Sequence, residues 1–457
     1  MKQYDVIVVG AGPGGYVAAI KARQLGFTTA IVEKNAIGGV CLNWGCIPTK
    51  AMLKSAKLYQ TFLHGADYGI QVDPSTVSVD YVGVLNRKNK IVKRLTGGVK
   101  MLLEKNGVEI YQGTAVFADA NTVHVGEEIL KTKNLILATG ASPILPKIEG
   151  LHEAYQKGIV KTSKEMLDRN TPIKHLVVIG GGVIGVEFAS IYAAFGSKVT
   201  IIEKLPVILN QIDDEVRDSY LKLLKRQKIE VITNAQVSKI NNQTVTYVKD
   251  NQSVSVEGDV ILAALGMVPN TNGLETLKLE LEGRAIKTNL QCQTSIPHVY
   301  AIGDVNGKSM LAHTASAEAI VAVETIAGHQ SAMDYEKIPS AIYGFPEIVT
   351  LGLTEKEAKS KGIDILISKF PIAANGKSLA DGETDGFIKL IADAKYHEIL
   401  GVHILATNAT EIVPELTLAM NLEATAEEIV NSVHMHPTLS EIILEAAHGI
   451  IDKPIHI

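Results

Sequence analysis

Cys41 and Cys46 stand five positions apart in the stretch GGVCLNWGCIPTK, and the rest of the chain holds only one further cysteine, Cys292. Two close thiols are either two small buried side chains or a pair that forms and breaks a disulfide, exchanging electrons with a bound cofactor. Helical positions five apart place their Cα atoms near or beyond the ~7 Å limit for a disulfide. We therefore expect a turn that enters a helix, with Gly45 giving the chain its freedom.

Oxidation of a dithiol also needs a base, because the thiolate and not the thiol is the nucleophile. His434 and His436 are candidates, but on an extended segment they would share a face, so their spacing cannot choose between them. Glu441 is suited to orient an imidazole, as a carboxylate does in other catalytic sites. It also completes a capping box with Thr438 before an apolar helix, and we expect that one carboxylate can hardly satisfy both roles fully.

Composition bounds the class of protein that must position these residues. The 457 residues are enough for about three domains, and 46% apolar and 20% charged residues are typical of a globular chain. A net charge of −5 with interleaved signs excludes a basic stripe for nucleic acid. The N-terminus enters a strand pattern too early for a secretory signal, and the most apolar window, 176–196, contains Glu187 and a run of three consecutive glycines. We expect a cytoplasmic protein that does not cross a membrane.

The sequence contains an internal repeat. Residues 4–34 and 174–204 align without a gap at an offset of 170, and nine of the 31 positions are identical. Each copy is an apolar run, a GxGxxG motif, a helix-length segment and a second β-rich run that ends in glutamate. The matched glycines and acids are Gly10 and Gly180, Gly12 and Gly182, Gly15 and Gly185, Gly26 and Gly196, and Glu33 and Glu203.

This repeat is the pattern of the dinucleotide-binding βαβ unit. Its first glycine makes the tight turn, the second lets the backbone approach a pyrophosphate, and the third lets the helix pack on the strand. A carboxylate at the end of the second strand can accept hydrogen bonds from a ribose. At the second copy, Glu203 would repel a 2′-phosphate, and Lys204 is not accompanied by an arginine, so we expect NAD rather than NADP.

Four motifs together resemble the pyridine nucleotide-disulfide oxidoreductases over the whole chain. GGVCLNWGCIPTK resembles the redox-disulfide signature of that family, and LILATGASP at 135–143 resembles the strand and turn that close the first half of its flavin domain. VYAIGDV at 299–305 resembles its second flavin motif, and HMHPTLSE at 434–441 resembles its C-terminal active-site motif.

The resemblance assigns a role to each matching residue. It implies a redox disulfide between Cys41 and Cys46, with His436 as the base and Glu441 as the group that holds its tautomer. It also pairs Lys50, beside the flavin, with Glu187. The residues that it implies for FAD are Gly10, Gly12, Gly14, Gly15, Glu33, Lys50, Gly113, Thr139, Gly140, Asp304 and Ala312; those for NAD are Gly180, Gly182, Gly185, Glu187, Glu203 and Gly266. No metal site is expected.

The implied fold is α/β, with two Rossmann-like dinucleotide-binding domains and a C-terminal α+β dimerisation domain. The expected boundaries are 1–145 for the first part of the FAD domain, 146–267 for the NAD domain, 268–334 for the second part of the FAD domain and 335–457 for the dimer interface domain. The resemblance implies a homodimer in which the histidine of one subunit faces the disulfide of the other.

The implied activity is oxidation of protein-bound dihydrolipoyl groups, with electrons passing through the disulfide and FAD to NAD. The partners would then be lipoyl-bearing subunits of a 2-oxo acid dehydrogenase or glycine cleavage complex. The alternatives are an NAD(P)H-dependent reductase of another small disulfide, an NADH oxidase and a non-catalytic FAD-binding scaffold. Met267 departs from the family, which commonly has arginine there, and the segment GVHILATNATE lacks a frequent glycine-proline step.

Overall fold

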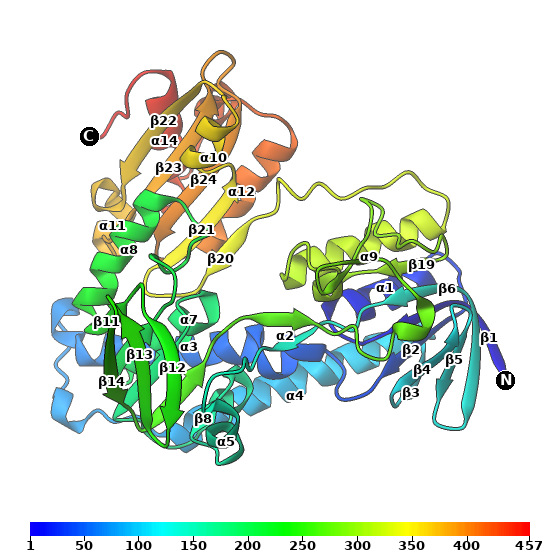
Figure 1. Ribbon diagram of the computed structural model, residues 1–457. Coiled ribbons are helices and arrows are strands. Elements are labelled where there is room, and N and C mark those ends of the chain that lie inside the picture. Colours follow the sequence, from blue (N-terminus) through cyan, green and yellow to red (C-terminus); the bar gives the residue numbers. More distant parts are fainter.

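The computed structural model describes residues 1–457, and three large sheets form the centres of three units (Figure 1). The first sheet has the order β3-β2-β1-β6-β5-β4, and β19 pairs in parallel with β6 although it lies far along the chain. Its strands are β1 (Lys2–Val9), β2 (Thr29–Glu33), β3 (Glu109–Gln112), β4 (Ala115–Asp119), β5 (Thr122–Val125), β6 (Glu128–Leu137) and β19 (Val299–Ala301).

Small residues allow the helices on the first sheet to pack closely. Helix α1 (Pro13–Gln24) begins with a proline, whose fixed φ suits the first turn. Ala18, Ala19 and Ala22 of α1 are fully buried, and α1 contacts helix α9 (Ala312–Ile326). Small side chains on this face let the helices approach closely and bring the loop after β1 next to the start of α9.

The second sheet repeats this design. It is parallel throughout, with the order β11-β10-β9-β15-β8, and helix α7 (Val183–Ala194) follows β9 as α1 follows β1. Its strands are β8 (Val160–Lys161), β9 (His175–Ile179), β10 (Lys198–Ile202), β11 (Ile229–Ile232) and β15 (Val260–Ala263). Strands β12 (Gln236–Asn241), β13 (Thr244–Lys249) and β14 (Gln252–Glu257) form a separate antiparallel sheet, and β16 (Met267–Pro269) pairs with β7 (Ala141–Pro143).

Helix α2 (Gly39–Trp44) and helix α3 (Cys46–Leu63) carry the cysteine pair away from the first sheet and toward the second. Met52, Leu53 and Ala56 of α3 belong to the same buried cluster as the core of the second sheet. Burial of this apolar face therefore fixes the cysteine-bearing helix at the junction between the two units. Helix α4 (Tyr81–Lys105) packs along α3.

The third sheet is antiparallel, with the order β20-β21-β24-β23-β22, and lies at the upper left of Figure 1. Its strands are β20 (Ser340–Ile342), β21 (Glu347–Gly352), β22 (Ile365–Pro371), β23 (Phe387–Asp393) and β24 (Ile399–Ala406), and its longer helices are α12 (Ala409–Asn421) and α14 (Glu441–Ile451). Two parallel-sheet units and a third α+β unit confirm the predicted fold class.

A buried ion cluster joins the third unit to helix α8 (Asp214–Arg226) of the second. The side chain of Lys389 is 1% exposed, and its ammonium lies 2.8 Å from Glu215 and 2.7 Å from Glu355. It also contacts Asp213 at the start of α8, at 3.1 Å. Because an unpaired buried charge would be costly, these contacts hold the two units in one orientation.

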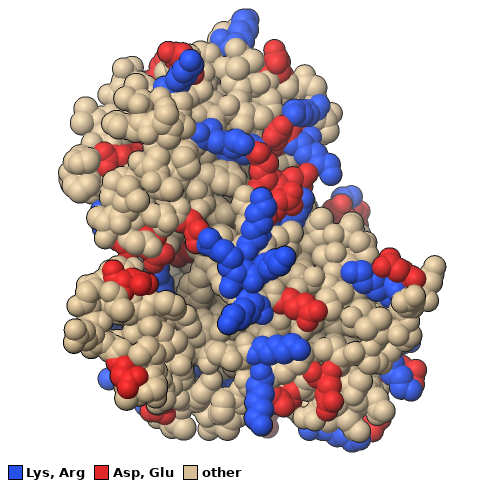
Figure 2. Space-filling model, turned by 90° about the vertical axis from the view of Figure 1, so that its left-hand side faces the viewer, with Lys and Arg blue, Asp and Glu red and all other residues tan.

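Charges of both signs lie on the surface. On the face drawn in Figure 2, Lys and Arg side chains gather near the centre, and Asp and Glu side chains lie beside them. None of the helices combines the length and the apolar character that crossing a membrane requires.

Candidate active site

Most of the predicted site residues line one cavity of about 1610 Å³ that contains both cysteines and both glycine loops. Those that line it are Gly10, Gly12, Gly14, Gly15, Glu33, Cys41, Cys46, Lys50, Gly113, Thr139, Gly140, Gly180, Gly182, Glu187, Glu203, Gly266, Asp304 and Ala312. Gly185 does not line it. A Cβ at Gly185 would lie 2.1 Å from a backbone carbonyl of the loop, as expected for a packing glycine. His436 and Glu441 also lie outside it.

The two glycine loops repeat each other down to single hydrogen bonds. Glu33 accepts from the N–H of Ala11 at 2.8 Å, and Glu203 accepts from the N–H of Gly181 at 2.6 Å. The second oxygen of each glutamate accepts from the backbone N–H two residues later, at 2.7 Å. A carboxylate has about four acceptor positions. Each glutamate therefore shapes its loop and keeps acceptor capacity for a ribose.

The first glycine of each loop has a backbone that only glycine adopts readily. Gly10 has φ 103° and Gly180 has φ 106°. A Cβ atom at either position would lie 2.1 to 2.2 Å from a backbone carbonyl oxygen. That oxygen belongs to the residue that directly follows the neighbouring strand of the sheet. By contrast, a Cβ at Gly182 would meet nothing within 4 Å. This open space is where a pyrophosphate would approach the backbone.

The cysteine segment differs from the predicted turn. Cys41 lies within the short helix α2, and Cys46 is the first residue of α3. The break between the helices falls at Gly45, with φ −140° and ψ −114°, so the glycine permits a sharp kink rather than a turn. No disulfide bond joins the two thiols in this structure.

The two thiols share one hydrogen bond unequally. The hydrogen bond with Cys46, and then burial, raise the pKa of Cys41. The same bond lowers the pKa of Cys46, and the Lys50 ammonium lowers it further, although burial acts in the opposite direction. Cys46 is thus the better thiolate of the two. Burial raises the pKa of Cys292 to about 12, so this third thiol is chemically inert by comparison.

The structure brings Lys50 and Glu187 together from different units. The Lys50 ammonium lies 3.0 Å from each Glu187 oxygen, and the Glu187 side chain is only 7% exposed. Lys50 is also one helical turn from Cys46 on α3, so its charge faces both the carboxylate and the thiol.

Glu318, in the middle of α9, is a site residue that the sequence analysis missed. It is fully buried, and its carboxylate accepts from the N–H of Gly303 at 2.5 Å and from the Asn306 amide at 2.9 Å. It therefore supports from behind the short turn that carries Asp304. The available signal was a lone glutamate inside the apolar helix segment ASAEAIVAV.

Asp304 gives the turn a pH-dependent stability. Burial, then the Glu318 charge, raise its pKa from 3.8 to about 6. The folded protein therefore binds more protons than the unfolded chain between these values, and the stability from this group, present below pH 3.8, is lost as the pH rises through 6. When the pH is raised from 4 to 7, the free energy of unfolding of the FAD-free protein, measured in urea, should fall by up to about 3 kcal/mol more than that of the Asp304→Asn variant. Parallel pH profiles would contradict this.

The histidines are distinguished by their surroundings. Both ring nitrogens of His434 are engaged, with Ser432 and with Glu415, and its side chain is 6% exposed. His436 is 78% exposed, and its Nδ1 lies 2.8 Å from Glu441, which leaves Nε2 for a substrate proton. Only His436 is thus arranged as a general base.

Glu441 takes part in both of its predicted roles, but it fills the capping role only in part. One carboxylate oxygen binds His436, and the other accepts from the N–H of Thr438 at 2.8 Å. The capping box is only half formed, because the Thr438 hydroxyl donates to Met435 and α14 begins at Glu441 itself. Burial raises the pKa of Glu441, but the bonds from Thr438 and His436 outweigh this and lower it.

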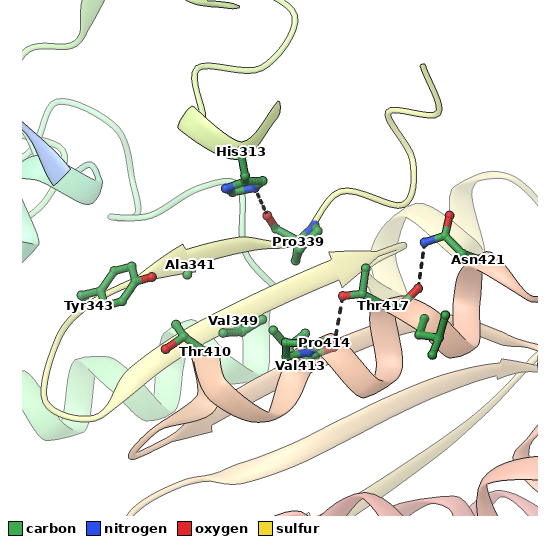
Figure 3. Close-up of a pocket in the computed structure, with 11 residues that line it drawn as sticks. His313, Pro339, Ala341, Tyr343, Val349, Thr410, Val413, Pro414, Thr417 and Asn421 are labelled. Atoms are coloured by element: carbon green, nitrogen blue, oxygen red, sulfur yellow. Dashed lines mark hydrogen bonds between the residues drawn. The ribbon is translucent and has the colours of Figure 1, made fainter. Parts of the chain in front are cut away.

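The third unit leaves apolar side chains uncovered near His436. Val433 is fully exposed and Met435 is 78% exposed. Leu418 and Leu422, at the end of α12, are 62% and 71% exposed. A groove of about 520 Å³ lies beside this helix, between α12, strand β20 and His313 (Figure 3). An apolar face of this extent is typical of a surface that another subunit covers.

Two dinucleotide loops, a cysteine pair in the same cavity and an uncovered apolar face define a disulfide oxidoreductase. The chain belongs to the pyridine nucleotide-disulphide oxidoreductase family, whose model matches residues 4–319, and the model of the family's dimerisation domain matches residues 338–447. The resemblance seen in the sequence is confirmed, as are FAD and NAD as cofactors. The match to the dimerisation domain supports a homodimer.

Curated relatives cover nearly the whole chain. The dihydrolipoyl dehydrogenase of Geobacillus stearothermophilus is 43% identical over 465 residues, 99% of this chain and 97% of the relative. That of Mycoplasma pneumoniae is 42% identical over 97% of both chains, and that of Acholeplasma laidlawii is 52% identical over 71% of this chain and 96% of the relative. A solved structure, the HOCl-induced flavoprotein disulfide reductase RclA from Escherichia coli, matches with a TM-score of 0.86 and 25% identity over 97% of this chain and 99% of that one.

Proposed function

We propose that this chain is a dihydrolipoyl dehydrogenase, which oxidises protein-bound dihydrolipoyl groups to lipoyl groups and reduces NAD⁺. The observation that carries the proposal is the single cavity in which Cys41 and Cys46 lie between two dinucleotide loops. The relatives at 40 to 52% identity with that name support the same substrate. The alternative is a reductase of another small disulfide, which the likeness to RclA at 25% identity favours less strongly.

The residues present fit both nucleotides. The loop from Gly10 to Gly15, with Glu33, would hold the adenosine half of FAD, and the turn at Asp304 would meet its ribityl chain. The loop from Gly180, with Glu203, would hold NAD. When bound, FAD supplies the two-electron chemistry that links the cysteine pair to NAD. The open backbone at the second glycine of each loop and the free acceptor positions of both glutamates leave room for these groups.

The protein's own residues account for the exchange of sulfur bonds. The imidazole of His436 of the partner subunit takes a proton from one substrate thiol, and the resulting thiolate attacks Cys41. The bond to Cys46 breaks, and Cys46 leaves as a thiolate, which the Lys50 charge stabilises. The sulfur of the second substrate thiol then attacks the substrate sulfur in the mixed disulfide, and its proton passes to Cys41, which leaves as a thiol. The substrate gains one disulfide, the first proton stays on His436 of the partner subunit, and the two cysteines retain the electron pair as the Cys41 thiol and the Cys46 thiolate.

The wider setting is part of the proposal. His436 lies outside the cavity that holds the cysteines of its own chain, which supports a homodimer with composite sites. Lipoyl arms would come from subunits of a 2-oxo acid dehydrogenase or glycine cleavage complex. A cytoplasmic location suits a cysteine pair that must cycle through its dithiol form. The proposed FAD domain consists of residues 1–145 and 268–334, the proposed NAD domain of residues 146–267 and the proposed interface domain of residues 335–457.

Anaerobic mixing of the purified protein with dihydrolipoamide and NAD⁺ tests this function. We expect rapid NADH formation, followed by its absorbance, and little activity when NADP⁺ replaces NAD⁺, because Glu203 would repel a 2′-phosphate. Oxidised glutathione with NADPH is the parallel reaction. Activity only in that parallel would contradict both the substrate and the nucleotide assignment and would favour the alternative reductase.

A further inference from the structure

Three units of the fold meet at Tyr343, which directly follows strand β20 of the third unit. Its backbone N–H donates to Glu187 Oε1 at 3.0 Å, and the Lys50 ammonium lies 4.1 Å from the centre of its ring. Because Lys50 and Glu187 also bind each other, the three residues form a closed cluster. Figure 3 shows the Tyr343 side chain near Thr410, where the groove ends.

The ring restricts a side chain that is otherwise flexible. The Lys50 side chain is 31% exposed, and a lysine has four rotatable carbons and a compact charge that water solvates well. The face of an aromatic ring attracts a cation. Glu187 binds the ammonium from one direction and the ring of Tyr343 faces it from another, so together they limit the positions that the charge can occupy.

The position of this charge matters for Cys46. The Lys50 ammonium lowers the pKa of Cys46, and the Glu187 carboxylate raises it. The titratable groups that act on Cys46 are Cys41 from α2, Lys50 from α3, Glu187 from α7 and Tyr343 from the third unit. A displaced ammonium would leave the opposing carboxylate charge less compensated.

We propose that Tyr343 is a positioning residue for the redox pair, whose ring holds the Lys50 ammonium beside Cys46. Tyr343 lies in the segment that the dimerisation-domain model matches. The unit that forms the dimer therefore also contributes to the charge that stabilises the Cys46 thiolate. The proposal rests on the cluster and on the cysteine pair, whatever dithiol the protein oxidises.

A series of ring-fluorinated phenylalanines at position 343 tests this contact, because fluorine withdraws charge from the ring face with little change of shape. In the holoenzyme reduced by dithiothreitol, the alkylation rate of Cys46 by iodoacetamide is measured against pH, and the modified cysteine is identified by mass spectrometry. Tyr343→Phe should titrate as the wild type does. Each added fluorine should raise the midpoint, by up to about one pH unit for trifluorophenylalanine, a tenfold change in the ionisation constant of the thiol.

Tyr396 offers a matched control in the same unit. Its ring lies 4.4 Å from the Lys395 ammonium, and its side chain is exposed. The same fluorinated series at position 396 should leave the titration of Cys46 unchanged. A flat series at 343, or equal shifts at both positions, would overturn the proposal. Because no dihydrolipoamide enters the measurement, its outcome is independent of the substrate assignment.

Discussion

Replacing Cys41 by serine should lower kcat/KM for dihydrolipoamide oxidation by at least about 10⁴-fold, because no other residue can supply the sulfur that the substrate thiolate attacks. Lys50, Glu187 and Tyr343 also act on Cys46, but none of them carries a sulfur atom. NADH formation under anaerobic conditions measures the loss.

Two comparisons separate loss of chemistry from loss of structure. Cys292→Ala removes a buried thiol outside the cavity and should retain activity within a few fold. Reduction of an artificial electron acceptor by NADH needs no cysteine pair, and Cys41→Ser should retain it. A Cys41→Ser protein that still oxidises dihydrolipoamide at one hundredth of the wild-type rate or faster would contradict the proposed exchange.

Replacing His436 by glutamine should lower kcat/KM by about 10²- to 10⁴-fold, the usual contribution of a general base. Glutamine keeps a hydrogen-bonding group near Glu441 but cannot take up a proton. His456→Gln is the matched control, because His456 is also an exposed histidine bound through Nδ1 to a glutamate of α14, Glu445.

Mixed dimers test whether His436 serves the partner's cysteines. Cys41→Ser and His436→Gln homodimers should each retain at most about one hundredth of the wild-type activity. In a mixed dimer, the intact cysteines of one subunit meet the intact histidine of the other, so random exchange of subunits should restore about one quarter of the wild-type activity. No recovery after verified exchange would mean that the base and the disulfide belong to one chain.

Much of this site could be predicted from short stretches of sequence. The spacing of Gly10, Gly12 and Gly15 and the glutamate that follows describe a local unit, and the structure reproduces the repeat down to the bonds of Glu33 and Glu203. A cysteine pair beside such a unit defines the class of chemistry. These features are local because turns, strand ends and helix starts depend on neighbouring residues.

Other features of the site depend on contacts between residues that are not neighbours along the chain, and the spacing of residues could not predict them. Spacing could not separate His434 from His436, because the difference is the contact of His434 with Glu415 on a preceding helix. The spacing of Thr438 and Glu441 also did not show that the two oxygens of Glu441 contact different groups, one His436 and the other the Thr438 N–H. A kink at Gly45, rather than a turn, followed from packing of α3 into the core of the second unit.

The sequence by itself determined the class of protein, the two nucleotides that it binds and its cysteine pair, since each of these depends on residues that lie close together along the chain. The family resemblance implied that Lys50 meets Glu187, a contact across 137 positions. Only the tertiary structure showed that Glu187 also meets Tyr343, across 156 positions. Such contacts depend on how the elements of the three units pack on a shared core, and no spacing in the chain encodes that packing.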